Sequence, residues 1–85
     1  PGFARRHGLN RYLIYAGRIE EGKRVDVAVE YAVRHAHERA DAPRLVLIGR
    51  GTYRPPPATR GVVLEPGFLS EPDKRGAFAE ALALV

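Results

Sequence analysis

Two short apolar runs, each closed by a glycine, constrain the fold of this chain more than any other feature. Residues 11–16 read RYLIYA and stop at Gly17, and residues 44–48 read RLVLI and stop at Gly49. Apolar residues do not alternate with polar ones in either run. This pattern is typical of strands that are buried on both faces of a parallel sheet.

The segment between the two runs has helical spacing instead. From Val25 to Ala36 the apolar residues recur at intervals of three and four, and the opposite face is polar. Glu30 and Arg34 form an i, i+4 pair in the favourable order. We expect a helix that begins at Val25 and is ended by Pro43.

After the second run the sequence predicts a loop, a strand, a helix and the start of another strand. The loop covers residues 50–61, which contain three consecutive prolines, and the strand covers residues 62–64. Ser70, three residues before an aspartate, has the signature of a helix N-cap, and it predicts a helix over residues 71–81. Residues 82–85 are apolar and are expected to open a fourth strand.

The order strand, helix, strand, loop, strand, helix, strand predicts an α/β domain. Such a pattern implies a parallel sheet with right-handed crossovers. With 85 residues there is room for one small domain, whose core is thin. Because no polar segment closes the sequence after the last apolar stretch, we interpret the chain as a truncated domain.

The balance of charge narrows the class of partner. The formal net charge is +4, which favours an anionic partner such as nucleic acid, a phosphate-bearing small molecule or acidic lipid. The chain has no cysteine, which excludes disulfides and thiolate chemistry, and no apolar run approaches the roughly 20 residues of a membrane helix. No cluster of histidines and carboxylates has metal-ligand spacing, so we predict neither a metal site nor catalytic residues.

The first strand delivers a cationic, glycine-containing loop to the place where α/β sheets bind anions. Ligands of such sheets lie beyond the carboxyl ends of the strands, near helix N-termini. Gly17 to Lys23 match the Walker A pattern G-x-x-x-x-G-K, but Arg24 replaces the serine or threonine that holds magnesium. The second strand also ends in Gly49 where a Walker B aspartate would stand. A fragment of a P-loop NTPase is therefore the least favoured alternative.

A series of motifs resembles the donor domain of family 4 glycosyltransferases. The pair Gly17 and Arg18, followed by Lys23 directly before an amphipathic helix, is similar to the motif with which that family binds the donor phosphates. Four further segments resemble the family's conserved stretches in the same order along the chain: FARRHGL at 3–9, LVLIGRG at 45–51, GFLS at 67–70 and ALALV at 81–85.

This resemblance implies a fold, a reaction and a set of binding residues. The fold would be the Rossmann-like, nucleotide-sugar-binding half of a GT-B enzyme, truncated, over residues 1–85. The intact enzyme would be a retaining hexosyltransferase of polysaccharide biosynthesis, using a UDP- or GDP-type donor and a carbohydrate or lipid-linked acceptor, without a metal or other cofactor. The family places the donor diphosphate at positions matching Gly17, Arg18 and Lys23. It places the nucleobase beside positions matching Gly49, Gly67, Phe68, Leu69 and Ser70.

The same resemblance sets expectations for location and partners. The intact enzyme would be cytoplasmic, with peripheral attachment to the inner membrane face through its acceptor domain, and nucleic acid is not an expected partner. The 85 residues lack the family's acceptor domain and its paired glutamates, so we expect this stretch alone to be inactive. The family also has a helix where residues 52–60 form a proline-rich loop, so we expect one sheet face to be thinly covered. A non-catalytic nucleotide- or nucleic-acid-binding module is the alternative from another class.

Overall fold

The computed structural model describes residues 2–20, 24–59, 61–67 and 69–84. Its elements are a short helix α1 (Gly2–Arg6), strand β1 (Tyr12–Ala16), helix α2 (Val25–Glu38), strand β2 (Arg44–Ile48), a single 3₁₀ turn at Pro57–Thr59, strand β3 (Val63–Leu64), helix α3 (Glu71–Glu80) and strand β4 (Ala83–Leu84). The described elements form an α/β fold with a parallel sheet, as the sequence predicts.

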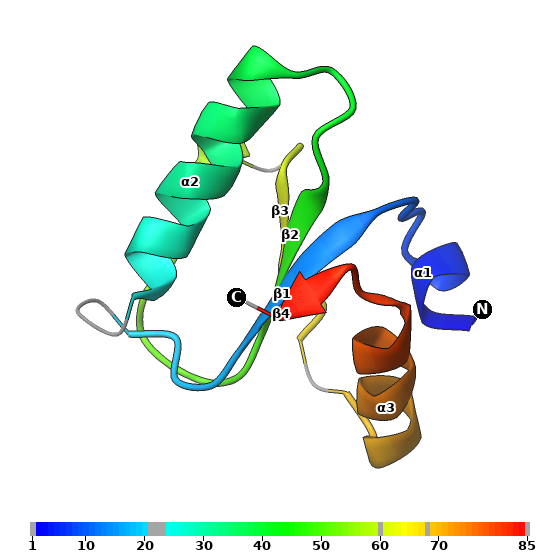
Figure 1. Cartoon of the computed structure of the whole chain (residues 1–85). Coiled ribbons are helices and arrows are strands. Elements are labelled where there is room, and N and C mark those ends of the chain that lie inside the picture. The colour runs from blue at the N-terminus through cyan, green and yellow to red at the C-terminus, as the bar shows by residue number, and fades with distance from the viewer. Residues whose placement is uncertain (1, 21–23, 60, 68, 85) are drawn as a thin grey trace.

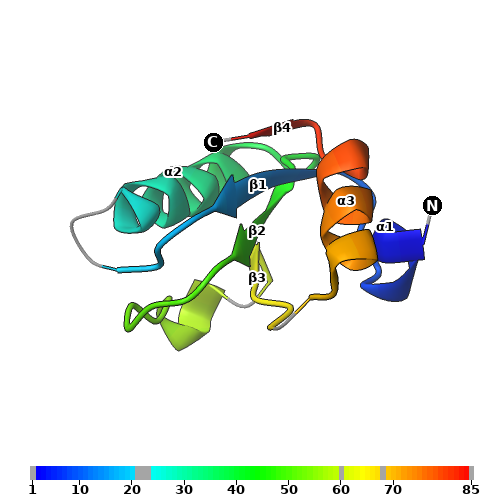
Figure 2. The same cartoon turned by 90° about the horizontal axis from the view of Figure 1, so that it is seen from below.

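All four described strands belong to one sheet in the order β3-β2-β1-β4, and every pairing is parallel. In the centre, Ile14 of β1 lies beside Val46 of β2. The sheet passes between two helical layers: α2 covers one face, and α1 and α3 lie together on the other (Figures 1 and 2). The expected fourth strand is confirmed, since β4 pairs with β1.

The alternation of side chains along the strands divides the core into two clusters. Successive residues of a strand point to opposite faces. Tyr12 and Ile14 therefore join the cluster under α1 and α3, while Leu45 and Leu47 join the cluster under α2. All four are at most 2% exposed, which explains why the two apolar runs carry no alternating polar residues.

The expectation of a thinly covered face is wrong for β2. Helix α2 packs on β2 and β3, and Tyr53 and Val62 of the proline-containing segment pack against the same cluster. These side chains add to the cover that α2 gives this part of the sheet. On the same face of the sheet, β1 is covered less completely than β2, since the side chains of Leu13 and Tyr15 are half-buried.

Two further details of the helices differ from expectation. Helix α2 ends at Glu38, not at Pro43, because Arg39 already has an extended backbone and donates its N–H to the carbonyl of His35. Residues 39–42 then turn the chain toward β2. Helix α1 was not predicted, because five residues are too few to show a helical period.

Helix α3 begins as the sequence predicts and is tied to the sheet at its other end. The Ser70 hydroxyl accepts a hydrogen bond from the Asp73 N–H at 3.3 Å. The buried Tyr12 hydroxyl donates to the carbonyl of Ala77 in the last turn. The last carbonyls of a helix have no partner within it, so this bond satisfies one of them.

Candidate anion-binding site at the carboxyl edge of the sheet

The carboxyl ends of β1, β2 and β3 meet at one edge of the sheet, because the strands are parallel. Two neighbouring hollows lie there, with volumes of about 370 and 320 Å³. Both are lined by Arg50 and Gly51, which follow β2. Gly17 and Arg18 add to the smaller hollow, and Gly49, Arg54 and Gly67 add to the larger one. We call these two hollows the carboxyl-edge site.

The segments that leave β1 and β2 stay hydrogen-bonded to one another beyond the strands. The Gly17 N–H donates to the Ile48 carbonyl at 3.0 Å, and the Ile19 N–H donates to the Arg50 carbonyl at 2.9 Å. The Tyr53 N–H then donates to the Ile19 carbonyl at 2.9 Å. The floor of the site is therefore a fixed backbone framework.

This framework accounts for the glycines that follow β2. A β-carbon on Gly51 would lie 1.9 Å from the Ile19 carbonyl oxygen, and one on Gly49 would also collide with the backbone after β1. Gly17 has no such neighbour, but its φ of 138° is one that other residues rarely adopt. The close approach of two backbones is thus a structural reason for glycine at residues 49 and 51.

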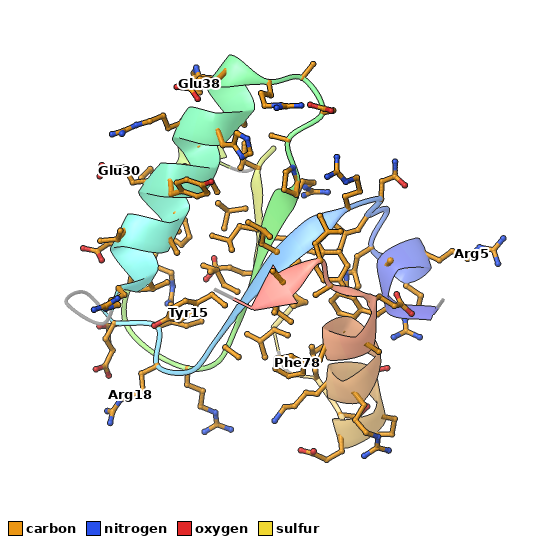
Figure 3. The ribbon with its side chains drawn as sticks, viewed as in Figure 1. Arg5, Tyr15, Arg18, Glu30, Glu38 and Phe78 are labelled. Carbon is orange, nitrogen blue, oxygen red and sulfur yellow. The ribbon has the colours of Figure 1, made fainter. Side chains whose placement is uncertain are left out.

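Arg18 extends from the site into solvent. Its side chain is 74% exposed and projects from the lower edge of the molecule (Figure 3). One guanidinium nitrogen lies 3.3 Å from a carboxylate oxygen of Glu20, and the Arg18 carbonyl accepts a hydrogen bond from the Tyr15 hydroxyl. The backbone of Arg18 is held in place, while its guanidinium can exchange the half-buried Glu20 carboxylate for another anion.

Arg50 and Arg54 are further cations of the site that the sequence reasoning did not assign to it. Arg50 is exposed and lines both hollows. Arg54 donates from one nitrogen to the carbonyls of Gly51 and Tyr53, at 3.0 and 3.1 Å. The position of Arg50 directly after a buried strand was a usable signal, since parallel strands deliver such residues to the same edge.

The start of α2 lies where the sequence predicts it, at Val25. Arg24 precedes it with a φ of 72° and gives no side-chain cap. The N–H of Val27 already donates to the Asp26 carboxylate at 2.9 Å. A negative charge in the first turn competes with any anion for this helix end, so the described cations at the strand ends are the stronger anion-binding groups.

The fold brings together only some of the remaining predicted residues. Gly67 lines the larger hollow together with Gly49. The Leu69 side chain is buried in the cluster under α1 and α3, and the Ser70 hydroxyl caps α3. Lys23 and Phe68 lie outside the described residues, so their predicted roles stay predictions.

Comparisons of the chain with protein-family models, with curated proteins and with solved structures gave no match. Among the described residues there is no group of three or more histidines and carboxylates that could hold a metal ion. Within the same part of the chain, no helix is both long and apolar enough to cross a membrane.

Proposed function

We propose that the carboxyl-edge site binds the diphosphate of a nucleotide sugar. The chain would then be the donor-binding part of a retaining glycosyltransferase of the family 4 type. The intact, cytoplasmic enzyme transfers a hexose from a UDP- or GDP-type donor to a carbohydrate or lipid-linked acceptor. The motif resemblance supplies the reaction and the donor class, and the geometry of the edge supports an anion as the ligand.

The topology supports this proposal at the level of the fold. The strand order β3-β2-β1-β4, with all pairs parallel, is the order of the first four strands of a dinucleotide-binding Rossmann sheet. In that arrangement the reversal of strand order lies between β1 and β4. Ligands of open α/β sheets bind beyond the carboxyl ends of the strands at such a point. Gly17 and Arg18 directly follow β1 there.

The observation that carries the proposal is that Arg18 and Arg50 line one hollow from two different strand ends. Their strands are neighbours, and the backbone bond from Ile19 to Arg50 fixes the distance between the two segments. Two guanidinium groups carried on such a backbone suit the oxygens of a diphosphate, which arginine binds with charge-assisted hydrogen bonds.

The proposed chemistry follows from this placement. When the bond between the sugar and the diphosphate breaks, negative charge builds on the leaving diphosphate. Cations at the site would stabilise that charge, which is the role a metal ion plays in other transferases. Arg18, Arg50 and Lys23 are the residues to which the proposal assigns this role.

The test is a titration of the 85-residue chain with UDP and with GDP in EDTA, followed through the backbone amides by NMR. The proposal predicts metal-free shifts at residues 17–20, 49–54 and 65–67. In the Arg18→Ala variant we expect binding about tenfold weaker, which is the loss of one charge-assisted hydrogen bond. Shifts that need magnesium and ATP would instead favour a P-loop NTPase, and shifts with oligonucleotides alone would favour a nucleic-acid-binding module.

The chain offers a matched control for this variant. Arg34 on α2 is 70% exposed and lies 3.5 Å from Glu30, much as Arg18 pairs with Glu20, but it does not line the carboxyl-edge site. Arg34→Ala should leave the affinity for UDP and GDP unchanged. Equal losses in both variants would show a nonspecific effect of charge and would reject the site.

A further inference from the structure

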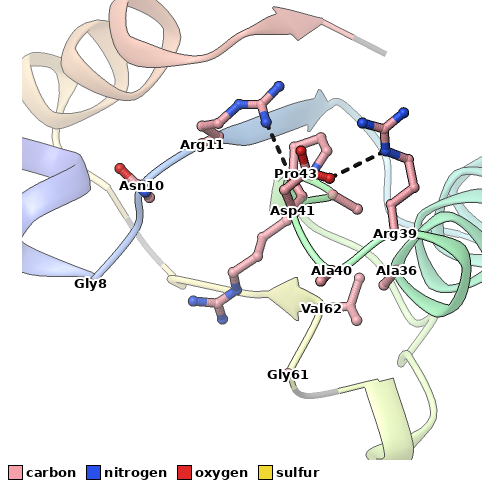
Figure 4. Close-up of a pocket in the computed structure, with 12 residues that line it drawn as sticks. Gly8, Asn10, Arg11, Ala36, Arg39, Ala40, Asp41, Pro43, Gly61 and Val62 are labelled. Atoms are coloured by element: carbon pink, nitrogen blue, oxygen red, sulfur yellow. Dashed lines mark hydrogen bonds and ion pairs between the residues drawn. The ribbon is translucent and has the colours of Figure 1, made fainter.

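A third hollow lined by arginines lies at the opposite, amino edge of the sheet. Its volume is about 420 Å³, and it is formed by the turn before β1, the connection from α2 to β2, and the residues before β3. Figure 4 shows Arg11 and Arg39 on either side of Asp41, with Gly8 and Asn10 in the neighbouring turn. We call this hollow the amino-edge pocket. Nothing in the family resemblance concerns it.

Positive charge is in excess in the amino-edge pocket. Three arginines line it, and Asp41 is the one carboxylate among its described lining residues. Asp41 is already engaged twice: its carboxylate accepts from Arg39 Nε at 3.2 Å, and its backbone carbonyl accepts from Arg11 at 3.1 Å. These two bonds orient two guanidinium groups, yet a single carboxylate does not neutralise the pocket.

Arg44 is the arginine of this pocket whose side chain lacks a full set of hydrogen-bond partners among the described residues. It is the first residue of β2, and its N–H donates to the carbonyl of Arg11, which places two arginines at the start of neighbouring strands. Its Nε is buried without a hydrogen-bond partner among the described residues. A buried donor without an acceptor costs free energy, which an acceptor on a bound ligand would recover.

The amino-edge pocket lies near the C-terminus of α2, and this helix end accounts for only part of the positive charge in the pocket. A cation near a helix C-terminus is stabilised by the helix dipole, which suffices for Arg39 next to the last residue of α2. Arg44 is the first residue of β2 and Arg11 directly precedes β1, so neither of them lies at a helix end. An anion in the pocket would offset the excess positive charge of the arginines that line it.

We propose that the amino-edge pocket binds a small molecule through a phosphoryl group, held by Arg44 with Arg39 and Arg11. Planar guanidinium groups bind phosphoryl oxygens in pairs of parallel hydrogen bonds. The volume of the pocket exceeds that of the ion itself and lies within the range of small-molecule sites. The pocket is separate from the carboxyl-edge site, so this proposal does not rest on the function proposed above.

Two probes test the proposal: inorganic phosphate, and glycerol phosphate as a simple phosphomonoester. Each is titrated against chloride at equal ionic strength, and the backbone amides are followed by NMR. We expect both probes to shift the amides of residues 8–11, 39–44 and 61–62, and to raise the melting temperature. Failure of either probe to reach these residues overturns the proposal.

The variants identify the binding residues. Arg44→Gln removes a cation whose Nε has no hydrogen-bond partner among the described residues, and it should weaken phosphate binding about tenfold. Arg39→Gln is the second variant, which covers the case that Arg44→Gln does not fold. Arg5→Gln is the control, since the exposed Arg5 points from α1 into solvent (Figure 3). Unchanged binding in both pocket variants, or equal loss in the control, refutes the assignment.

Arg18→Ala separates this proposal from the carboxyl-edge site. That substitution should abolish none of the phosphate-induced shifts at the amino edge. Phosphate shifts confined to residues 17–20 and 49–54 would assign the bound anion to the carboxyl edge and would overturn the amino-edge proposal.

Discussion

A β-carbon on Gly49 would lie 1.8 Å from the carbonyl oxygen of Gly17. The two glycines follow neighbouring parallel strands, β2 and β1, and the Gly17 N–H is bonded to Ile48 at 3.0 Å. Gly49 also has a φ of 146°, which other residues rarely adopt. A glycine that looks from the sequence like part of a nucleobase site is thus required by the packing of two backbones, whatever the ligand.

Gly49→Ala should destabilise the protein strongly. Both the collision with the Gly17 carbonyl and the backbone conformation oppose a side chain, and the atom in the way belongs to the backbone. We expect a loss of at least about 2 kcal/mol in the free energy of unfolding, measured by denaturant titration. Gly61→Ala is the control: a β-carbon there meets no atom within 4 Å, so the change should stay within about 0.5 kcal/mol. Similar losses for both variants would contradict the role of the close approach.

Tyr12→Phe should destabilise the connection between β1 and α3. The substitution keeps the ring in the core but leaves the Ala77 carbonyl without its partner from Tyr12. An unsatisfied buried acceptor costs about 1–3 kcal/mol, which thermal or chemical unfolding would detect. Tyr31→Phe, on an exposed ring of α2, should have no measurable effect. A neutral result for Tyr12→Phe would mean that the hydroxyl contributes nothing to stability.

The same tyrosine should make the protein sensitive to alkali. Burial first, and the nearby Glu80 carboxylate second, raise the pKa of Tyr12 above its ordinary value of 10.0. A raised pKa in the folded state means that its stabilising contribution is complete below pH 10.0 and is lost as the pH rises through the folded value. Unfolding measured across this range should show a steeper loss of stability for the wild type than for Tyr12→Phe. Parallel curves would reject the assignment.

Glu20→Gln should strengthen nucleotide binding at the carboxyl edge. Glu20 pairs with Arg18 at 3.3 Å and competes with a diphosphate for the same guanidinium. Removing the charge of this half-buried partner should tighten UDP or GDP binding about two- to fivefold, measured by calorimetry. The matched change Glu30→Gln frees Arg34 on α2 and should not alter the affinity. Weaker binding in Glu20→Gln would indicate that Glu20 itself contacts the ligand.

Ser70→Ala should loosen the start of α3. The Ser70 hydroxyl accepts from the Asp73 N–H, and the loss of such a cap costs about 1 kcal/mol. Thr52→Ala, at an exposed loop residue, is the control and should be neutral. If the role of Ser70 is confined to the cap, nucleotide affinity in Ser70→Ala should match that of the wild type once both are folded.

The sequence by itself determined the strands that have uninterrupted apolar runs and the helices that have a clear local signal. The uninterrupted apolar runs before Gly17 and Gly49 gave β1 and β2, because a strand buried on both faces has no place for polar residues. The helical spacing from Val25 and the cap at Ser70 gave α2 and α3, since both signals are local. These features depend on residues a few positions apart, which a sequence displays directly.

Only the tertiary structure decided which of the predicted site residues lie together. Arg50 joins Arg18 at one hollow because two parallel strands end at the same edge. The side chain of Leu69, by contrast, is buried in the core, and its place beside a nucleobase stays a prediction. The collision that excludes a side chain at Gly49 and the meeting of Arg11 with Arg44 also arise between segments far apart in the chain. Such relationships depend on strand register and backbone approach, and no local periodicity in the sequence encodes them.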